Sequence, residues 1–377
     1  MRRGLLVGLL VLLLAWPASS QEPIKIGVLM PLSGPFAAGG VAALQSLHLA
    51  EETINAEGGI SGRRVALVVA DSQGRAEIAR TEALRLVERE GVWALVGAYL
   101  SEETLPVQDV AAEKQVLHMV PVAATMEVSE RVAKDPRFRF SFRISYNIAQ
   151  WAALLSTFLE RAGSRQYAFV GVNIRWNREL LDHLKSVLAG KVELVYEGFY
   201  SPQAPQMEPL VVAIRERRPD FVVLGDPGAG AIEFIKRAKE LDLQSRFLSV
   251  GGALGDARVA ASLPSGEYLY FQAATWRGLT PQATQYFSRF QKRYQYLPVG
   301  YSDTLPHDAL TVLAQAAVRA GSFQPADVIR TLEQGQFPGV AGIYSFDRSH
   351  QAIWGQGGLK GAVIQWVNGS DRVIVFR

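Results

Sequence analysis

Residues that could carry enzyme chemistry are present in this chain, but they form no known catalytic pattern. No Gly-x-Ser-x-Gly nucleophile turn and no Gly-Lys-Ser/Thr phosphate loop occurs. His307 and Asp308 are neighbours and resemble half of a catalytic dyad, but packing at the start of a helix explains an isolated pair better. The remaining histidines are scattered and form no zinc-binding His-x-x-x-His pair: His48, His118, His183 and His350. The sequence therefore predicts a protein that is not an enzyme and that needs no cofactor.

A glycine-rich loop, Gly225 to Ala231, follows a strand-like segment and precedes a helical pattern. This is the context of a dinucleotide-binding motif. Gly228 and Gly230 fit that motif, but Glu233 stands where a third small residue is needed. Asp226 would also place a negative charge beside the phosphates. We therefore interpret the loop as part of a ligand cleft, in which Asp226 faces a ligand.

Hydroxyl side chains follow two other strand-like segments. Ser101 comes after the apolar run 92–96, with Tyr99 close by, and Thr125 comes after the run 116–120. Hydroxyl and backbone N–H groups can bind the carboxylate or amide of a small ligand. Helix capping is the alternative role for Ser101 and Thr125, and it is the more frequent one when the residues are taken alone.

The elements that position these residues begin with the stretch from Ile24 to Asp71. Ile24 to Met30 is a short apolar run rich in β-branched residues, and Val65 to Ala70 is a second one, so both are predicted to be buried strands. Between them, apolar residues recur at helical spacing: Leu44, Leu47, Ala50 and Ile54. A strand–helix–strand unit gives a parallel pair, and open parallel sheets bind ligands at the carboxyl ends of the strands. The loop Ser33-Gly34-Pro35 lies at such an end.

The same alternation continues along the chain and predicts an α/β fold of two doubly wound, Rossmann-like lobes. A length of 377 residues also favours two lobes. Further strands are expected at 92–96, 116–120, 138–144, 167–172, 192–199, 220–224, 246–250, 265–274, 362–367 and 372–376. Helices are expected at 76–90, 102–114, 150–161, 175–188, 207–217, 281–296, within 301–320 and at 325–335. The predicted first lobe comprises residues 24–142 plus 275–348, and the second comprises 143–274 plus 349–377.

Residues 1–20 are predicted to be a secretory signal peptide. Arg2 and Arg3 precede an apolar run from Gly4 to Trp16, and small residues lead to a cleavage site just before Gln21. An uncleaved membrane anchor is the alternative, but the run is short for a span of roughly 20 residues. The chain is therefore expected in the periplasm.

Composition excludes several classes of function. The chain has 39 basic and 36 acidic residues, and loss of Arg2 and Arg3 leaves 37 basic residues, so the mature protein is nearly neutral. No nucleic-acid partner is therefore expected. The chain has no cysteine, which excludes disulfides, thiol catalysis, structural zinc fingers and a lipid-anchored cysteine.

The amino-terminal stretch resembles the first lobe of type I periplasmic solute-binding proteins, the family of the leucine/isoleucine/valine-binding and amide-binding proteins. The matching segments are Lys25-Ile-Gly, Leu32-Ser-Gly-Pro35, Gly40, Ile54-Asn-Ala, Gly58-Gly-Ile-Ser-Gly-Arg63 and Asp71, in this order and spacing. A Gly-x-x-x-Phe-Asp segment ending at Asp347 extends the resemblance over nearly all of the mature chain. The resemblance implies two lobes joined by a multi-strand hinge and a monomer that delivers a small-molecule ligand to the membrane permease of an ATP-driven importer. A ligand sensor of the amide-binding type is the alternative, and an enzyme on a doubly wound scaffold is a weaker one.

The resemblance also implies which residues contact the ligand. Ser101 matches the family's ligand-binding serine, and Tyr99 with Ser101 is most similar to the amide-binding branch. Ala124 stands where the second binding loop usually has Thr, and Trp176 falls where an aromatic residue often covers the ligand, although a core or surface role explains it equally well. The full set of predicted ligand contacts is Ser33, Phe36, Tyr99, Ser101, Ala123, Ala124, Thr125, Tyr146, Asn147, Trp176, Asp226 and Gly251.

One departure from the family concerns the charge of the ligand. Amino-acid binders of this family place a second-lobe carboxylate on the ligand's ammonium, and an ungapped alignment from Asp220 puts Gly251 at that position. An enclosed ammonium without a partner would be strongly destabilised. Either the ligand lacks the ammonium or Asp226 supplies the charge, and we favour the first.

Overall fold

The structure is a computed structural model that describes residues 22–203, 206–226, 229–264, 266–355 and 357–376. The predicted signal peptide lies outside the described residues. No helix within these ranges is long and apolar enough to cross a membrane.

The first sheet has five parallel strands in the order β2-β1-β3-β4-β5. Its strands are β1 (Ile24–Met30), β2 (Val65–Asp71), β3 (Ala94–Gly97), β4 (Leu117–Val120) and β5 (Ser141–Arg143). The short apolar runs form strands because both faces of the sheet are covered by helices, which leaves β3 and β4 fully buried. All five strands therefore end at one edge, where the loops that follow them meet.

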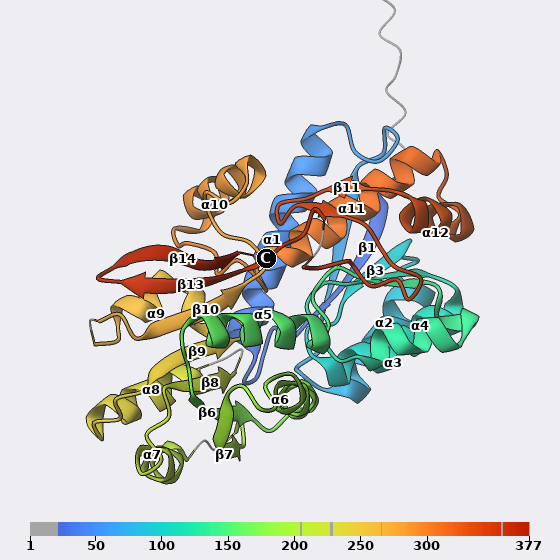
Figure 1. Ribbon diagram of the computed structural model, residues 1–377. Coiled ribbons are helices and arrows are strands. Elements are labelled where there is room, and N and C mark those ends of the chain that lie inside the picture. The colour runs from blue at the N-terminus through green and yellow to red at the C-terminus, as the bar shows by residue number, and fades with distance from the viewer. Residues whose placement is uncertain (1–21, 204–205, 227–228, 265, 356, 377) are drawn as a thin grey trace, which may run out of the picture.

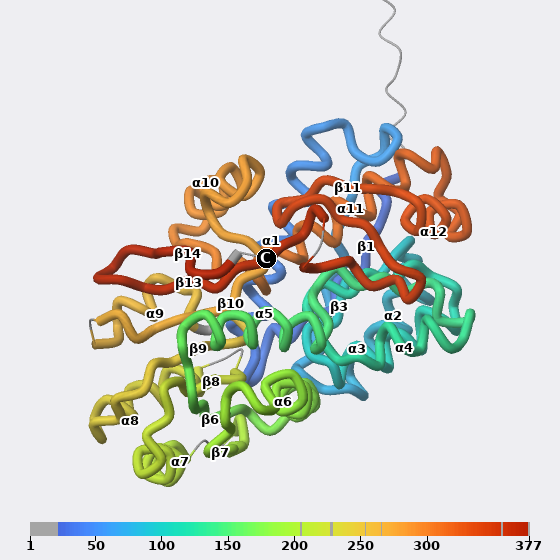
Figure 2. Tube along the Cα trace, in the orientation of Figure 1, coloured from blue at the N-terminus to red at the C-terminus, as the bar shows by residue number. Residues whose placement is uncertain are grey.

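Helices cover both faces of this sheet. One face packs against α2 (Ala76–Glu88) and α3 (Ser101–Lys114), whose apolar residues form a compact cluster with Leu29 and Leu95. The other face packs against α1 (Ala37–Ala56) and α11 (Leu305–Ala320), which lie side by side although they are far apart in sequence (Figure 2). α12 (Pro325–Gln334) packs on α11.

The second sheet has seven strands in the order β14-β13-β10-β9-β8-β6-β7 (Figure 1). β6 (Gln166–Val172), β7 (Glu193–Tyr200), β8 (Phe221–Gly225), β9 (Arg246–Val250) and β10 (Leu269–Ala273) are parallel. The hairpin of β13 (Ala362–Val367) and β14 (Ser370–Phe376) adds two antiparallel strands. This sheet confirms the predicted terminal hairpin.

Helices also cover both faces of the second sheet. α5 (Ile148–Arg161) and α6 (Arg175–Val187) bury their apolar residues on one face. α7 (Met207–Arg215), α8 (Gly230–Glu240) and α10 (Pro281–Tyr294) cover the other, and the short α9 (Ala257–Ala261) lies beside them. The apolar face of α10 thus packs with this second sheet, although its residues fall in the segment assigned to the first lobe. The lobe boundaries themselves remain a prediction.

Most predicted elements are present, and the differences have local causes. α4 (Glu127–Lys134) was not predicted from the sequence; it is a short helix in which only Val128, Ser129 and Val132 are buried. The strand expected at 138–144 is reduced to Ser141–Arg143 because the 3-10 turn η1 (Pro136–Phe138), capped by Asp135, precedes it. A second 3-10 turn, η2 (Ala253–Gly255), and a two-stranded ribbon of β11 (Phe337–Pro338) and β12 (Ile343–Tyr344) were also not predicted.

Candidate ligand-binding site

A small cavity lies between the two sheets, where loops from both reach the same place. Its volume of about 20 Å³ leaves room for about one water molecule. Its walls from the first sheet are Tyr99, Leu100, Ser101, Val122, Ala123 and Ala124. The others are Trp151 of α5, Trp176 of α6, Gly251 after β9 and Tyr301 before α11. The lobes are therefore closed on each other in this structure.

Two loops of the first sheet are tied together at the cavity wall. Leu100 is the N-cap residue of α3, and its backbone N–H donates to the buried Glu103 carboxylate at 3.0 Å. Ser101 is thus the first residue of the helix, and its Oγ accepts a hydrogen bond from the Thr125 N–H at 3.3 Å. Ser101 does not cap its own helix, so the capping alternative does not describe its contact.

Tyr99 reaches from the end of β3 towards α1. A Cβ at Gly39 would come within 2.2 Å of the Tyr99 Oη, so the start of α1 must carry a glycine at this point. Burial raises the pKa of Tyr99 to about 12, with a smaller opposing effect from Ser302. The phenol is therefore neutral at physiological pH, and it can donate or accept a hydrogen bond.

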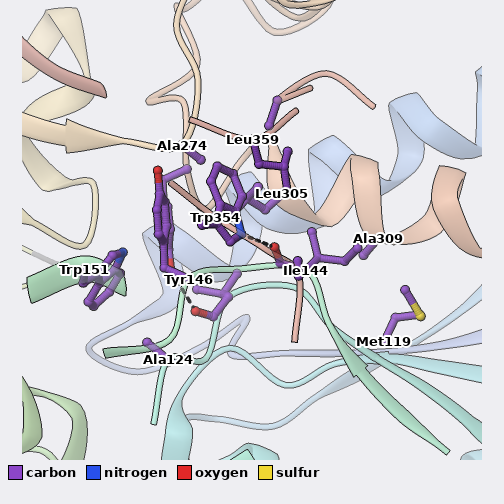
Figure 3. Close-up of a cluster of buried hydrophobic side chains, with 14 of the residues drawn as sticks. Met119, Ala124, Ile144, Tyr146, Trp151, Ala274, Leu305, Ala309, Trp354 and Leu359 are labelled. Atoms are coloured by element: carbon purple, nitrogen blue, oxygen red, sulfur yellow. Dashed lines mark hydrogen bonds between the residues drawn. The ribbon is translucent and has the colours of Figure 1, made fainter. Parts of the chain in front are cut away.

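Aromatic rings form most of the remaining wall. Trp151 contacts Trp176 edge-to-face at 5.2 Å between ring centroids and Tyr301 at 5.4 Å. Tyr301 is held by a hydrogen bond from its Oη to the Val122 carbonyl at 2.9 Å. Figure 3 shows Trp151 beside the layer that contains Tyr146, in the region where the Trp354 indole donates to the Ile144 carbonyl at 2.9 Å. These rings form a rigid apolar surface with few polar atoms.

The closed arrangement is held by polar contacts across the cleft, which we call the interlobe contacts. The Glu179 carboxylate of α6 accepts hydrogen bonds from Thr125 Oγ1 at 2.7 Å and from the Met126 N–H at 3.1 Å. In the opposite direction, Glu102 Oε1 accepts from the Arg175 N–H at 2.6 Å, and the Arg175 guanidinium lies 2.8 Å from Glu127 Oε2. Glu179 and Glu102 thus each face the amino end of a helix in the other lobe, where a negative charge is favourable.

A buried cation that was not predicted from the sequence lies directly behind the Ala123–Thr125 loop. Arg143 is 1% exposed and donates to the Thr125 carbonyl, Ser129 Oγ and Gln351 Oε1, all of which are uncharged. Burial lowers its pKa to about 9, so the guanidinium remains charged at neutral pH. A charged residue in a three-residue buried strand gives no sequence signal, because its acceptors come from distant segments.

Six of the twelve predicted ligand contacts line the cavity: Tyr99, Ser101, Ala123, Ala124, Trp176 and Gly251. Two others lie beside it. Thr125 directs its hydroxyl to Glu179, and Tyr146 stacks on Trp354 at 4.1 Å between centroids. The role of all of these residues in ligand binding remains a prediction.

The structure places the other four predicted residues outside the cavity wall. Ser33 is exposed and donates to Asp71 Oδ2 at 2.7 Å. Phe36 is the N-cap residue of α1, and Asn147 caps α5 in a capping box with Gln150. Asp226 is buried and accepts a hydrogen bond from the Tyr200 hydroxyl.

Four lining residues were not predicted from the sequence. Leu100 and Val122 are neighbours of predicted residues, so a wider reading of the same loops would have included them. Trp151 and Tyr301 had no such signal, because they reach the cavity only through the packing of α5 and of the segment before α11.

Comparison with known proteins agrees with this architecture. The periplasmic binding protein family model matches residues 23–370. The chain is 24% identical over 379 residues to Leu/Ile/Val-binding protein homolog 1 of Brucella melitensis, covering 98% of both chains. It is also 24% identical over 353 residues to an amino acid binding protein of Pseudomonas aeruginosa, covering 92% of both.

Solved structures have the same fold. The branched-chain amino acid transporter substrate binding protein LivJ of Streptococcus pneumoniae, in complex with isoleucine, superposes with a TM-score of 0.81 at 19% identity, covering 94% of this chain and 99% of LivJ. An ABC transporter solute binding protein of Rhodopseudomonas palustris, in complex with benzoate, gives a TM-score of 0.83 at 20% identity, with 94% and 96% coverage. The chain therefore belongs to the type I periplasmic binding proteins of the leucine/isoleucine/valine-binding family.

Proposed function

We propose that this protein is the exported solute-binding component of an ATP-driven importer, and that it captures a small ligand between its lobes. The observation that carries the proposal is a cavity whose walls come from both lobes and which the interlobe contacts hold shut. A hinge motion that opens and closes this cleft would admit and trap a ligand. The closed form would then be recognised by the membrane permease.

Several observations support a small organic ligand that carries a carboxylate or an amide. Ser101 offers a hydroxyl and the start of α3 to such a group, and aromatic rings cover the opposite side. The solved relatives include complexes with isoleucine and with benzoate. Processing before Gln21 would release the mature chain into the periplasm, where we expect it to act as a monomer.

A thermal-shift panel of amino acids, amides and carboxylic acids tests this function, since a ligand that binds only the folded state raises the melting temperature. The panel should be run on the wild type, on Trp176→Ala and on Trp93→Ala. Trp93 is a matched control because it precedes β3 at the end away from the cavity and packs on Phe323. We expect the stabilising compound to lose most of its effect in Trp176→Ala and to keep it in Trp93→Ala. An equal effect in both variants would place the ligand elsewhere.

A further inference from the structure

We propose that the ligand of this site is an organic acid without an ammonium group, whose apolar body lies among the aromatic rings of the cavity. This inference rests on the proposed function and narrows its ligand class. It follows from the charges around the cavity, from its unpaired polar atoms and from the shape of its walls.

The cavity wall offers nothing that pairs with an ammonium. None of its ten residues, Tyr99, Leu100, Ser101, Val122, Ala123, Ala124, Trp151, Trp176, Gly251 and Tyr301, carries a formal charge at neutral pH. Gly251 lines the cavity at the position that the alignment assigns to the family's carboxylate, and its φ of +100° disfavours a side chain there. An ammonium that enters such a cavity loses its water without an ionic partner, which is strongly unfavourable.

Glu179 and Asp226 already have hydrogen-bond partners of their own. Glu179 accepts hydrogen bonds from Thr125 and Met126 across the cleft. Asp226 accepts a hydrogen bond from the Tyr200 hydroxyl and is absent from the cavity wall. This placement argues against the alternative in which Asp226 supplies the charge that pairs with an ammonium.

Two further carboxyl groups near the cavity also fit an ammonium poorly. Asp303 is fully buried and accepts from the N–H groups of Val299 and Gly300 at 2.7 and 3.2 Å. Burial raises the pKa of Asp303 to about 7, and its two oxygens are already occupied by these backbone donors. Glu102 accepts from Arg175 through Oε1, while its buried Oε2 has no hydrogen-bond partner among the described residues. Glu102 does not line the cavity, but its unpaired oxygen could accept a hydrogen bond from an ammonium. The test therefore includes a Glu102 variant.

Hydrogen-bond donors, in contrast, belong to the cavity wall, and a buried cation lies behind it. α3 starts at Ser101, and the first N–H groups of a helix have no partner within the helix. Trp151 is only 3% exposed. Its indole N–H can donate a hydrogen bond but cannot accept one, and it has no acceptor among the described residues. The Arg143 guanidinium lies one residue layer behind Thr125 with uncharged acceptors only. A carboxylate admitted by opening of the cleft would meet both the Trp151 indole donor and the start of α3 in the cavity wall.

The rest of the wall selects the body of the ligand. Tyr99, Trp151, Trp176 and Tyr301 present rings, and Leu100 and Val122 add aliphatic surface. Such walls favour a flat ring or a branched alkyl group over a polar chain.

Isothermal titration calorimetry on two matched pairs of compounds tests the inference. The pairs are 4-methylpentanoate with leucine and 3-phenylpropanoate with phenylalanine, because the members of each pair differ only in the ammonium group. We expect the acid of at least one pair to bind at least about tenfold more tightly than its amino acid, which equals about 1.4 kcal/mol. Trp151→Phe keeps the ring and removes the donor, so it should weaken binding of that acid by about fivefold or more while the melting temperature without ligand changes little.

The outcomes separate this inference from the proposed function. If an amino acid binds as tightly as its matched acid or more tightly, the inference is wrong and the proposed function stands. If Glu102→Gln then abolishes binding of that amino acid, Glu102 is the residue that pairs with the ammonium. If none of the four compounds binds but another ammonium-bearing compound of the thermal-shift panel does, the inference is likewise wrong. If no compound of the panel binds, the proposed function fails and the inference fails with it.

Discussion

Replacing Glu179 by Gln should weaken ligand binding without unfolding either lobe. The Glu179 carboxylate accepts two hydrogen bonds from the other lobe, from Thr125 Oγ1 and from the Met126 N–H. The charge also faces the start of α4, so it gains from the helix dipole. These contacts exist only when the cleft is closed, so their loss acts on the closed form.

The size of the effect follows from the geometry. A hydrogen bond to a charged group contributes about 1.5–3 kcal/mol when it is buried. The Glu179 side chain is 26% exposed, which reduces that value, and Gln keeps one acceptor oxygen. We therefore expect the closed form to lose about 1–2 kcal/mol, which corresponds to about 5–30-fold weaker binding if the ligand binds the closed form.

Calorimetry with the tightest ligand of the thermal-shift panel measures this change. Glu160→Gln is the matched control, since Glu160 pairs with Lys191 at 3.0 Å within the second sheet's own helices and loops. Small-angle scattering should also show that saturating ligand closes Glu179→Gln less completely than the control. Equal affinities for the two variants would refute the reasoning that these contacts hold the cleft shut.

Three further predictions address the cavity wall, the core and the amino terminus. Ser101→Ala should weaken ligand binding by about 0.5–3 kcal/mol with the fold intact; unchanged affinity in calorimetry would remove Ser101 from the site. Burial lowers the pKa of His118 to about 4 from 6.5, so the neutral imidazole is favoured in the folded state and the unfolded chain takes up its proton first. The free energy of unfolding should therefore fall as pH drops from about 6.5 towards 4, and urea melts at pH 7 and pH 5 should show a smaller fall in His118→Gln than in the wild type. Mass spectrometry of the periplasmic fraction should find a processed chain that begins near Gln21, whereas recovery only from membranes with residues 1–20 intact would contradict the signal peptide.

The sequence predicted the fold well because its signals are local. The apolar runs at Ile24–Met30 and Val65–Asp71 become parallel strands in register. β1 is buried at six of its seven residues, which leaves little choice of structure, whereas β2 lies at the edge of the sheet and is mostly half-buried, so the prediction of a buried strand there was wrong. The failures are also local. α4 contains only eight residues and three buried side chains, so its periodicity is too short to be distinguished from a loop.

The candidate site was only partly predictable. Ser101, Tyr99 and Ala124 follow directly from strands, so the topology places them at the carboxyl edge. Asn147 illustrates the opposite case, because the Asn-x-x-Gln capping signature that it forms with Gln150 was legible in the sequence and indicates a structural role.

Other parts of the site depend on tertiary packing alone. Tyr301 meets Val122 across 179 residues of chain, and the hydrogen bond between Glu179 and Thr125 joins two lobes. Neither contact can be derived from a periodic pattern or a turn signal, because each depends on how the two sheets close on each other.

Fluorine NMR of protein labelled with 5-fluorotryptophan shows whether the ligand lies among the cavity rings. The tryptophans beyond the predicted signal peptide are Trp93, Trp151, Trp176, Trp276, Trp354 and Trp366. Trp151 and Trp176 line the cavity, whereas Trp93 and Trp366 lie outside its wall. On saturation with the tightest ligand of the panel, the resonances of Trp151 and Trp176 should shift while those of Trp93 and Trp366 stay in place. Unchanged resonances of Trp151 and Trp176, with shifts at Trp93 or Trp366 instead, would place the ligand outside the cavity.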